Sequence, residues 1–268
     1  ATITGATFNE EKLTVEDGVI TIPDSMKNGV HGSNVITVFA TKGNTKYTIT
    51  VPITIVTESI ATITRLKEVV GYPQSGTGKT HEGEYFILAD DITHSENYGA
   101  ANNLGEGNGF AGTLDGRNHS LIGGNGGGLF GSIQDGTVKN IKFLQVNPVG
   151  ENRTLIASTL YNATLENIEI KTYAVTVTKF TYSWGYFGVF ASHRIKNVTM
   201  KDVSVDMSTS SIIWVFGSGW DNAATGNYHC ENVVIKLKSL TYLAKSSNGD
   251  QPTLAKDAIT GIKVTEVE

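Results

Sequence analysis

The chain has a single cysteine, Cys230, among its 268 residues. No disulfide can therefore form within it, and a metal site built on several cysteines is not expected. The composition fits either the cytosol or a bacterial exterior, where disulfides are optional. No apolar run approaches the roughly 20 residues that a membrane-spanning helix needs. The net charge is -5 and no basic block occurs, so nucleic acid is not an expected partner.

Charged residues are also scarce, at 18 %, whereas the chain holds 30 glycines and is rich in Thr, Asn, Val and Ile. This composition predicts a β-rich protein with many tight turns. The chain begins with Ala1 rather than Met, so we expect it to be a processed or excised piece of a longer polypeptide with further domains.

The stretch PQSGTGKT, residues 73–80, matches only the end of a nucleotide-binding P-loop. Pro73 stands where the motif needs glycine. A helical pattern precedes the stretch and a strand pattern follows it, whereas a P-loop runs from strand to helix and places the phosphates on the helix N-terminus. We therefore expect a flexible loop and no nucleotide, and the sequence predicts no cofactor.

Residues 1–57 alternate between apolar and polar positions. The predicted strands are KLTV, GVITIP, NVITVFAT and TKYTITVPITIV, separated by turn signals such as EDG and KGN. These strands predict a small antiparallel β-sandwich, which is short for a complete immunoglobulin-type module.

The remainder, residues 58–268, contains a repeat. Four segments each have a large apolar residue followed by a small one, at Phe130–Gly131, Ile156–Ala157, Phe187–Gly188 and Phe216–Gly217. The spacing is 26 residues (130 to 156), then 31 (156 to 187), then 29 (187 to 216). This is about one turn of a parallel β-helix with three short strands. One such turn cannot bury its own inward face, but stacked turns can.

Each repeat also holds an asparagine in the pattern apolar–charged–Asn–apolar. The four asparagines are Asn140, Asn167, Asn197 and Asn232. We interpret them as an inward-facing ladder in which each amide bonds to the next turn, as in stacked strands. The alternative is that they are ordinary turn residues.

An open β-helix end exposes its core and needs a cap. The amphipathic segment ITRLKEVV, with Thr62 as a predicted N-cap, is placed to cover the first turn.

EYFILADDIT, GFAGTLDGRNHSLIG and GGLFGSIQDGTVKNIKF together resemble the opening turns of right-handed parallel β-helix domains with GLUG-type repeats, which occur in bacterial surface and secreted proteins. A bacterial Ig-like module often precedes such domains. Residues 1–57 resemble such a module more loosely. The resemblance implies a pectate-lyase-like right-handed parallel β-helix for residues 58–268 and an extracellular or cell-surface location. It says little about activity, because this fold carries adhesins, lyases, hydrolases and phage tail proteins.

Catalysis on such a fold would need clustered ionisable groups. Glycoside hydrolysis needs two carboxylates that flank the bond, and a polyuronate lyase needs several around a calcium ion. No such cluster is visible in the sequence, the histidines form no zinc motif, and the pattern predicts no metal site. Cys230 occupies the apolar slot of Val138, Leu165 and Ile195, which indicates a buried structural thiol. The candidate acids are Asp90, Asp91, Asp115, Asp135, Glu166, Asp202, Asp206 and Asp221.

Aromatic residues gather in the last two repeats. Tyr182, Trp184 and Tyr186 alternate and so share one strand face, and Trp220 follows in the next repeat. If that face is outward, the rings form a platform on which sugars could stack. The alternative is that the rings fill the core.

The sequence therefore predicts a non-catalytic extracellular surface or adhesion module that binds a glycan or another cell-surface ligand. Two alternatives stay open. One is a carbohydrate-active lyase or hydrolase on the same fold, and the other is a structural spacer or phage-fibre segment.

Overall fold

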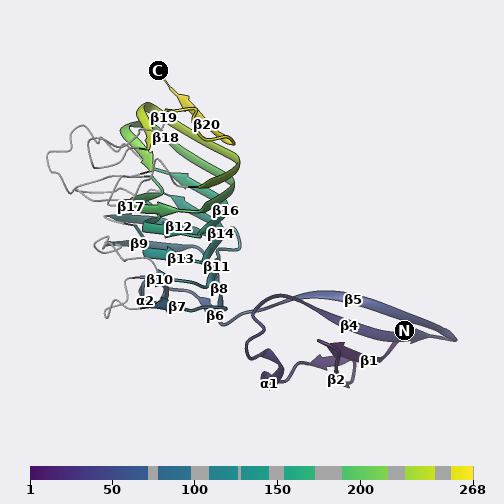
Figure 1. Ribbon diagram of the computed structural model, residues 1–268. Coiled ribbons are helices and arrows are strands. Elements are labelled where there is room, and N and C mark those ends of the chain that lie inside the picture. The colour runs from purple at the N-terminus through teal and green to yellow at the C-terminus, as the bar shows by residue number, and fades with distance from the viewer. Residues whose placement is uncertain are drawn as a thin grey trace. The chain divides into compact units, whose positions relative to one another are not determined.

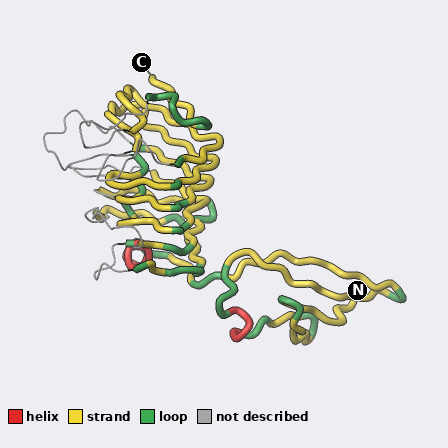
Figure 2. Tube along the Cα trace, in the orientation of Figure 1, coloured by secondary structure: helices red, strands yellow, loops and turns green. Residues whose placement is uncertain are grey.

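The computed structural model of the chain describes residues 1–71, 78–97, 109–125, 128–144, 154–172, 189–216, 227–244 and 255–267. The chain forms two compact units, one of Ala1–Glu58 with Gly83–Phe86 and one of Ser59–Glu82 with Ile87–Glu268. Strands dominate both units, as the composition predicts, so the all-β prediction is confirmed (Figure 2).

The first unit is an antiparallel sheet with the strand order β3-β2-β1-β4-β5 (Figure 1). Its core consists of Ala6, Phe8, Leu13, Ile36, Val38 and Ile55. The first strand was not predicted, because Gly5 interrupts the alternation that ends in Ala6 and Phe8. The elements of this unit are β1 (Thr2–Phe8), β2 (Glu11–Glu16), β3 (Val19–Thr21), α1 (Asp24–Lys27), β4 (Gly32–Lys42) and β5 (Thr45–Ile55).

The second unit is built from short strands in parallel register that stack into three rows (Figure 1). Its elements are β6 (Glu58–Ile60), α2 (Ile63–Val70), β7 (Lys79–Thr80), β8 (Tyr85–Leu88), β9 (Ile92–Asn97), β10 (Gly109–Phe110), β11 (Thr113–Asp115), β12 (Ser120–Asn125), β13 (Phe130–Gln134), β14 (Thr137–Leu144), β15 (Ala157–Tyr161), β16 (Thr164–Lys171), β17 (Ala191–Lys196), β18 (Val198–Phe216), β19 (Tyr228–Ala244) and β20 (Ile262–Glu266).

The chain passes through the three rows in the same order each time. Row A contains β7, β10, β13, β15, β17 and the ends of β18 and β19. Row B contains β6, β8, β11 and the first halves of β14, β16, β18 and β19. Row C contains β9, β12, the following parts of β14, β16, β18 and β19, and finally β20. We call one pass through rows A, B and C a storey.

The core lies between the rows, and each storey contributes side chains that sit directly against those of the next. In row B the register aligns Val138 with Leu165, Leu165 with Met200, and Met200 with Cys230. Full burial of an aliphatic side chain contributes roughly 1.5–3 kcal/mol. Since each apolar row is shared by neighbouring storeys, stability comes from the stack and not from any single storey.

Two details of the sequence alignment are wrong. The slot of Cys230 is shared with Met200, whereas Ile195 lies in row A beside Leu160. The register also aligns Phe130 with Ala157, not with Ile156. The reason is that the storeys differ in length. A shift of the strand register by one residue cannot be detected from the sequence, but it moves each side chain to the opposite face of the strand.

The cap prediction agrees with the structure in its local detail. The Thr62 hydroxyl accepts a hydrogen bond from the Arg65 amide at 3.2 Å, so Thr62 is the N-cap of α2. The apolar face of this helix is buried through Ile63, Leu66, Val69 and Val70. The helix lies at the β6–β7 end of the stack and packs near β9 and β13 (Figure 2).

At the other end of the stack, the side chain of Glu266 binds a main-chain amide of β19. The Glu266 carboxylate accepts a hydrogen bond from the Leu240 amide at 2.8 Å and pairs with the Lys256 ammonium at 2.7 Å. These two contacts, the lysine first, hold the pKa of Glu266 below its ordinary value. A main-chain donor near the end of β19 is thus satisfied by a side chain.

Candidate functional site at the corners of the stack

The corner between rows B and C is made by residues in the left-handed backbone conformation. Asn140, Asn167, Asp202 and Asn232 have φ of 52°, 50°, 52° and 53°. Asn and Asp tolerate this conformation better than other residues that carry a Cβ. Each residue therefore turns the chain by the same amount at the same place in its storey.

The side chains at this B–C corner bond from storey to storey. The Asn140 amide donates to the Asp115 carboxylate at 3.0 Å, and the Asn167 amide donates to the Asn140 carbonyl oxygen at 2.9 Å. Two storeys further on, the Asn232 amide donates to the Asp202 carboxylate at 2.7 Å. The corner thus joins residues that lie about one storey apart in the sequence.

A second column of the same kind lies at the corner between rows A and B. The Asn162 amide donates to the Asp135 carboxylate at 2.7 Å, and the Asn197 amide donates to the Asn162 carbonyl oxygen at 2.9 Å. The Asn227 amide donates in turn to Asn197 at 2.9 Å. The stack therefore has two columns of Asn and Asp side chains.

The predicted inward-facing ladder is split between these two columns, and it lies at the surface, since Asn167 and Asn232 are exposed. Asn140, Asn167 and Asn232 belong to the B–C corner, whereas Asn197 belongs to the A–B corner, and Asp202 takes the B–C position in its storey. The alignment misplaced Asn197 because both corners use an Asn or Asp in the left-handed conformation. Of the A–B corner residues Asp135, Asn162 and Asn197, only Asn197 is also flanked by the apolar and charged residues of the B–C pattern, in Ile195-Lys196-Asn197-Val198.

Asp135 closes the A–B column with a cluster of donors. Its carboxylate lies 2.6 Å from the Lys79 ammonium and also accepts from Gln134 at 3.0 Å. The Lys79 and Asn162 hydrogen bonds lower the pKa of Asp135 to about 2. The same contact with Asp135 raises the pKa of Lys79. Lys79, which mimics a phosphate-binding lysine in the sequence, is thus an ion-pair partner in this structure.

The outward side of row B carries charges of alternating sign. The register aligns Asp115 with Lys139, Lys139 with Glu166, Glu166 with Lys201, and Lys201 with Glu231. The Lys201 and Glu231 charges are 3.8 Å apart. Opposite charges on neighbouring strands each contribute only about 0.2–1 kcal/mol. Glu166 is therefore part of a solvated cross-strand series.

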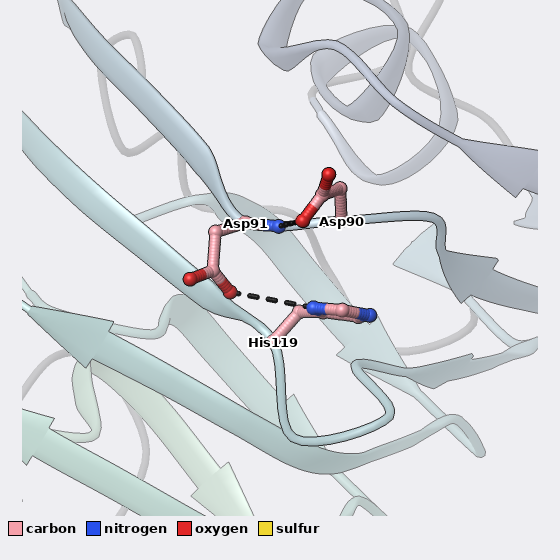
Figure 3. A group of neighbouring side chains, drawn as sticks. All are labelled: Asp90, Asp91 and His119. Carbon is pink, nitrogen blue, oxygen red and sulfur yellow. Dashed lines mark hydrogen bonds and ion pairs between the residues drawn. The ribbon is translucent and has the colours of Figure 1, made fainter.

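Three ionisable side chains, those of Asp90, Asp91 and His119, lie together in one cluster (Figure 3). The aspartates lie in the turn between β8 and β9, and His119 directly precedes β12. Parallel pairing of Ile92 with Leu121 places these two corners in adjacent storeys. One ligand atom from each of the three side chains lies within 4.8 Å of the other two.

Asp91 is the centre of this cluster. Its carboxylate accepts from the Ser120 amide at 2.7 Å and lies 3.3 Å from Nδ1 of His119. The Ser120 hydrogen bond, and then the one with His119, hold the pKa of Asp91 below its ordinary value. Asp90 accepts from the Asp91 amide at 2.8 Å, which fixes the turn (Figure 3).

This geometry permits two kinds of chemistry. If Nδ1 of His119 carries the proton, Asp91 orients the ring and leaves Nε2 able to accept a proton from a bound molecule. Alternatively, two carboxylates and one imidazole are a ligand set that divalent transition metals accept. Both readings need access from solvent, and both aspartates are exposed.

This cluster was not predicted from the sequence. Asp90 and Asp91 were among the candidate acids, and the histidines form no zinc motif along the chain. A usable signal exists, because His119 lies 28 residues after Asp91 (119 − 91), about one storey.

The remaining candidate acids do not converge. Asp202 has a left-handed backbone and belongs to the B–C corner, where it accepts from Asn232. Asp206 instead accepts from the Ser208 amide at 3.2 Å. Burial raises the pKa of the half-buried Cys230 thiol to about 11, so it is not a thiolate at neutral pH. Asp221 lies outside the described residues.

The predicted aromatic platform also lies outside the described residues. This applies to Tyr182, Trp184 and Tyr186, which follow β16, and to Trp220, which follows β18. The platform therefore stays a prediction.

No protein-family model, curated protein or solved structure matches the chain. Within the described ranges, no helix is long and apolar enough to cross a membrane.

The B–C column generates a prediction about Asn167. Replacement by Gly keeps the left-handed backbone accessible but removes the amide, which should lower the free energy of unfolding by about 1 kcal/mol. Replacement by Ala adds left-handed strain and should cost about 2 kcal/mol. Urea denaturation of both variants measures the difference, with Glu166→Ala as the neighbouring control that should change little. An Ala variant as stable as the Gly variant would contradict the backbone argument.

The A–B column generates a prediction about acid stability. The pKa of Asp135 is lowered in the folded chain, so its stabilisation is present above the unfolded value of about 4 and is lost as the pH falls through about 2. The wild type should therefore lose more thermal stability between pH 4 and pH 2 than Asp135→Asn. Thermal melts across this range measure the effect, and Glu166→Gln serves as the control. Parallel curves for the wild type and Asp135→Asn would show that the carboxylate is not stabilising.

Proposed function

We propose that the chain is a non-catalytic extracellular surface or adhesion module of a bacterial protein. In this proposal residues 58–268 form a right-handed parallel β-helix of the GLUG-repeat type, and residues 1–57 form a small Ig-like β-sandwich. The three parallel rows, the storey spacing of about 30 residues and the turn residues at both corners support the β-helix. The antiparallel strands β1 to β5 support the Ig-like module.

The hydrogen bonds of three aspartates support the proposal that the module is non-catalytic. Asp115, Asp135 and Asp202 each accept a hydrogen bond from an asparagine of a neighbouring storey. Asp135, whose pKa is lowered to about 2 chiefly by its Lys79 and Asn162 hydrogen bonds, is poorly suited to donate a proton. All three carboxylates are occupied as acceptors within the stack. Most of the acids in the described part of the stack thus serve its architecture or its solvated outer face.

The proposed ligand is a glycan or another cell-surface molecule. Tyr182, Trp184, Tyr186 and Trp220 supply the expected stacking surface, because sugar rings pack their C–H faces on aromatic rings. In the sequence, Tyr182, Trp184 and Tyr186 fall between β16, which ends in row C at Lys171, and β17, which begins in row A at Ala191. Segments between the strands of a rigid scaffold commonly carry binding residues.

The cluster of Asp90, Asp91 and His119 favours a second candidate function. It brings an oriented imidazole and two exposed carboxylates to one corner of the stack (Figure 3). A carbohydrate-active lyase or hydrolase could use His119 as the base and the aspartates for charge stabilisation or for a cation. This is the only grouping of this kind found among the described residues.

The adhesion proposal predicts that Trp184 is needed for binding. On a glycan array, the wild type should bind a restricted set of sugars, and Trp184→Ala should bind them at least about tenfold more weakly, because one stacked ring is lost. Phe39→Ala, which removes an exposed ring of the first unit from the face opposite to that of Tyr47, is the matched control and should bind like the wild type. Equal binding by wild type and Trp184→Ala would remove the platform. Absence of binding by either protein would favour the spacer.

The enzyme candidate makes a separate prediction. If it holds, incubation with neutral and uronate-containing polysaccharides, with and without a divalent cation, yields shorter products. His119→Ala abolishes them, whereas His229→Ala, which removes another solvent-exposed imidazole, does not. If the adhesion module holds, none of the three proteins forms product. Chromatography of the products distinguishes the outcomes.

A further inference from the structure

The strand β5 ends the antiparallel sheet and has β4 as its neighbour. Its eleven residues pair with β4 along their whole length, from Lys42 opposite Thr45 to Gly32 opposite Ile55. A terminal strand turns half of its main-chain N–H and C=O groups away from the sheet. The molecule that best satisfies a row of such groups is another extended strand.

The apolar face of the sheet continues onto β5 without cover. Residues opposite each other on paired strands lie on the same face, and the register pairs Ile36 with Val51 and Val38 with Ile49. Ile36 and Val38 are 8 % and 6 % exposed, whereas Val51 and Ile49 are 38 % and 49 % exposed. Tyr47, which pairs with the buried Ala40, is 44 % exposed. The apolar face of the sheet is therefore buried on β4 but exposed on β5.

The strand also has few of the features that prevent edge pairing. Lys46 is its only charged residue, and none occurs from Tyr47 to Ile55. Natural edge strands are usually blunted by central charges, bulges or proline. Pro52 is the one such residue in β5, and it removes one N–H.

We propose that β5 pairs antiparallel with β5 of a second copy of this chain, about a two-fold axis at Thr50. In this register Ile49 lies opposite Val51 of the second copy, and Tyr47 lies opposite Ile53, so apolar side chains meet on the core face. Lys46 lies opposite Thr54, which keeps the two lysines at opposite ends of the interface. The same patch serves both copies, so the assembly closes as a dimer and does not propagate.

The strand itself argues for a second copy over an unrelated strand. An isologous interface requires a patch that is complementary to itself, and the apolar positions Tyr47, Ile49, Val51 and Ile53 are symmetric about Thr50. Ile55, which falls opposite Thr45, is buried in its own sheet. The absence of any acidic residue from Thr45 to Ile55 means that the patch offers no charge pattern to select a different partner. Pro52 falls opposite Thr48 in this register and costs one inter-strand hydrogen bond for each copy.

Sedimentation of the full chain tests this directly. The wild type should change with micromolar concentration from the 28.7 kDa of one chain towards twice that mass. Ile49→Lys places a charge on the proposed interface and should weaken association at least about thirtyfold. The matched control is Val19→Lys, because Val19 is exposed on β3 at the opposite edge of the sheet, and this change should leave the dimer intact.

Three results would overturn the proposal: a wild type that stays monomeric at about 100 µM, growth beyond two copies, or equal effects of the two lysine variants. Ile49 is half exposed, so its replacement should not unfold the chain, and circular dichroism of each variant checks this.

A cross-link tests the register. In a Cys230→Ser background, Thr50→Cys should form an intermolecular disulfide on mild oxidation, because residues facing each other across antiparallel strands lie about 4.5–5.5 Å apart at Cα. Thr14→Cys, on the exposed side of β2, is the control and should cross-link poorly. A dimer in which the Thr14 variant links as well as the Thr50 variant would place the interface elsewhere and contradict the proposal.

Discussion

The second unit depends on one hydrogen bond that recurs between storeys. At Asn162, Asn167 and Asn197 a carboxamide donates to the Asn or Asp side chain of the neighbouring storey, while its own backbone adopts the left-handed conformation. Glycine would allow the turn but has no side chain with which to bond. Most other residues would strain the backbone. Asparagine satisfies both requirements, and it is therefore the residue that keeps successive strands in parallel register.

This constraint explains why the chemistry of the unit is distributed as it is. The acids at the corners accept hydrogen bonds from asparagine amides of neighbouring storeys, and Asp135 also pairs with the Lys79 ammonium. Asp135 shows the extreme case, since its carboxylate receives Lys79, Gln134 and Asn162 together. Asp91 differs because its partners are a main-chain amide and an imidazole, and the imidazole retains a second nitrogen that can act on another molecule. The hydrogen-bond partners of Asp135 and Asp91 therefore distinguish a structural carboxylate from one that could take part in chemistry.

The sequence predicted the features that repeat locally and missed those that depend on register. The parallel storeys follow from a spacing of about 30 residues, and the N-cap at Thr62 follows from its position before an amphipathic segment. Assigning Asn197 to its column required knowing whether its turn joins rows A and B or rows B and C, and both turns have the same residue requirements. The separation of His119 from Asp91 matches one storey in the sequence, but the pairing of Leu121 with Ile92 is needed to place both residues at the same corner. The strand β1 was missed because Gly5 breaks its alternation, although Ala6 and Phe8 are core residues of their sheet.

The edges of the two units are treated differently, and the difference has a physical meaning. An unpaired strand edge invites association, so a chain that avoids association must satisfy or cover it. In the second unit, α2 buries an apolar face at one end, and at the other end the Glu266 carboxylate accepts from the Leu240 amide while it pairs with Lys256. In the first unit, β5 has an uncharged central stretch and an uncovered apolar row. An exposed set of apolar side chains of this kind costs free energy in water. Because the ends of the second unit are protected and β5 is not, we infer that a partner covers β5 in the functioning assembly.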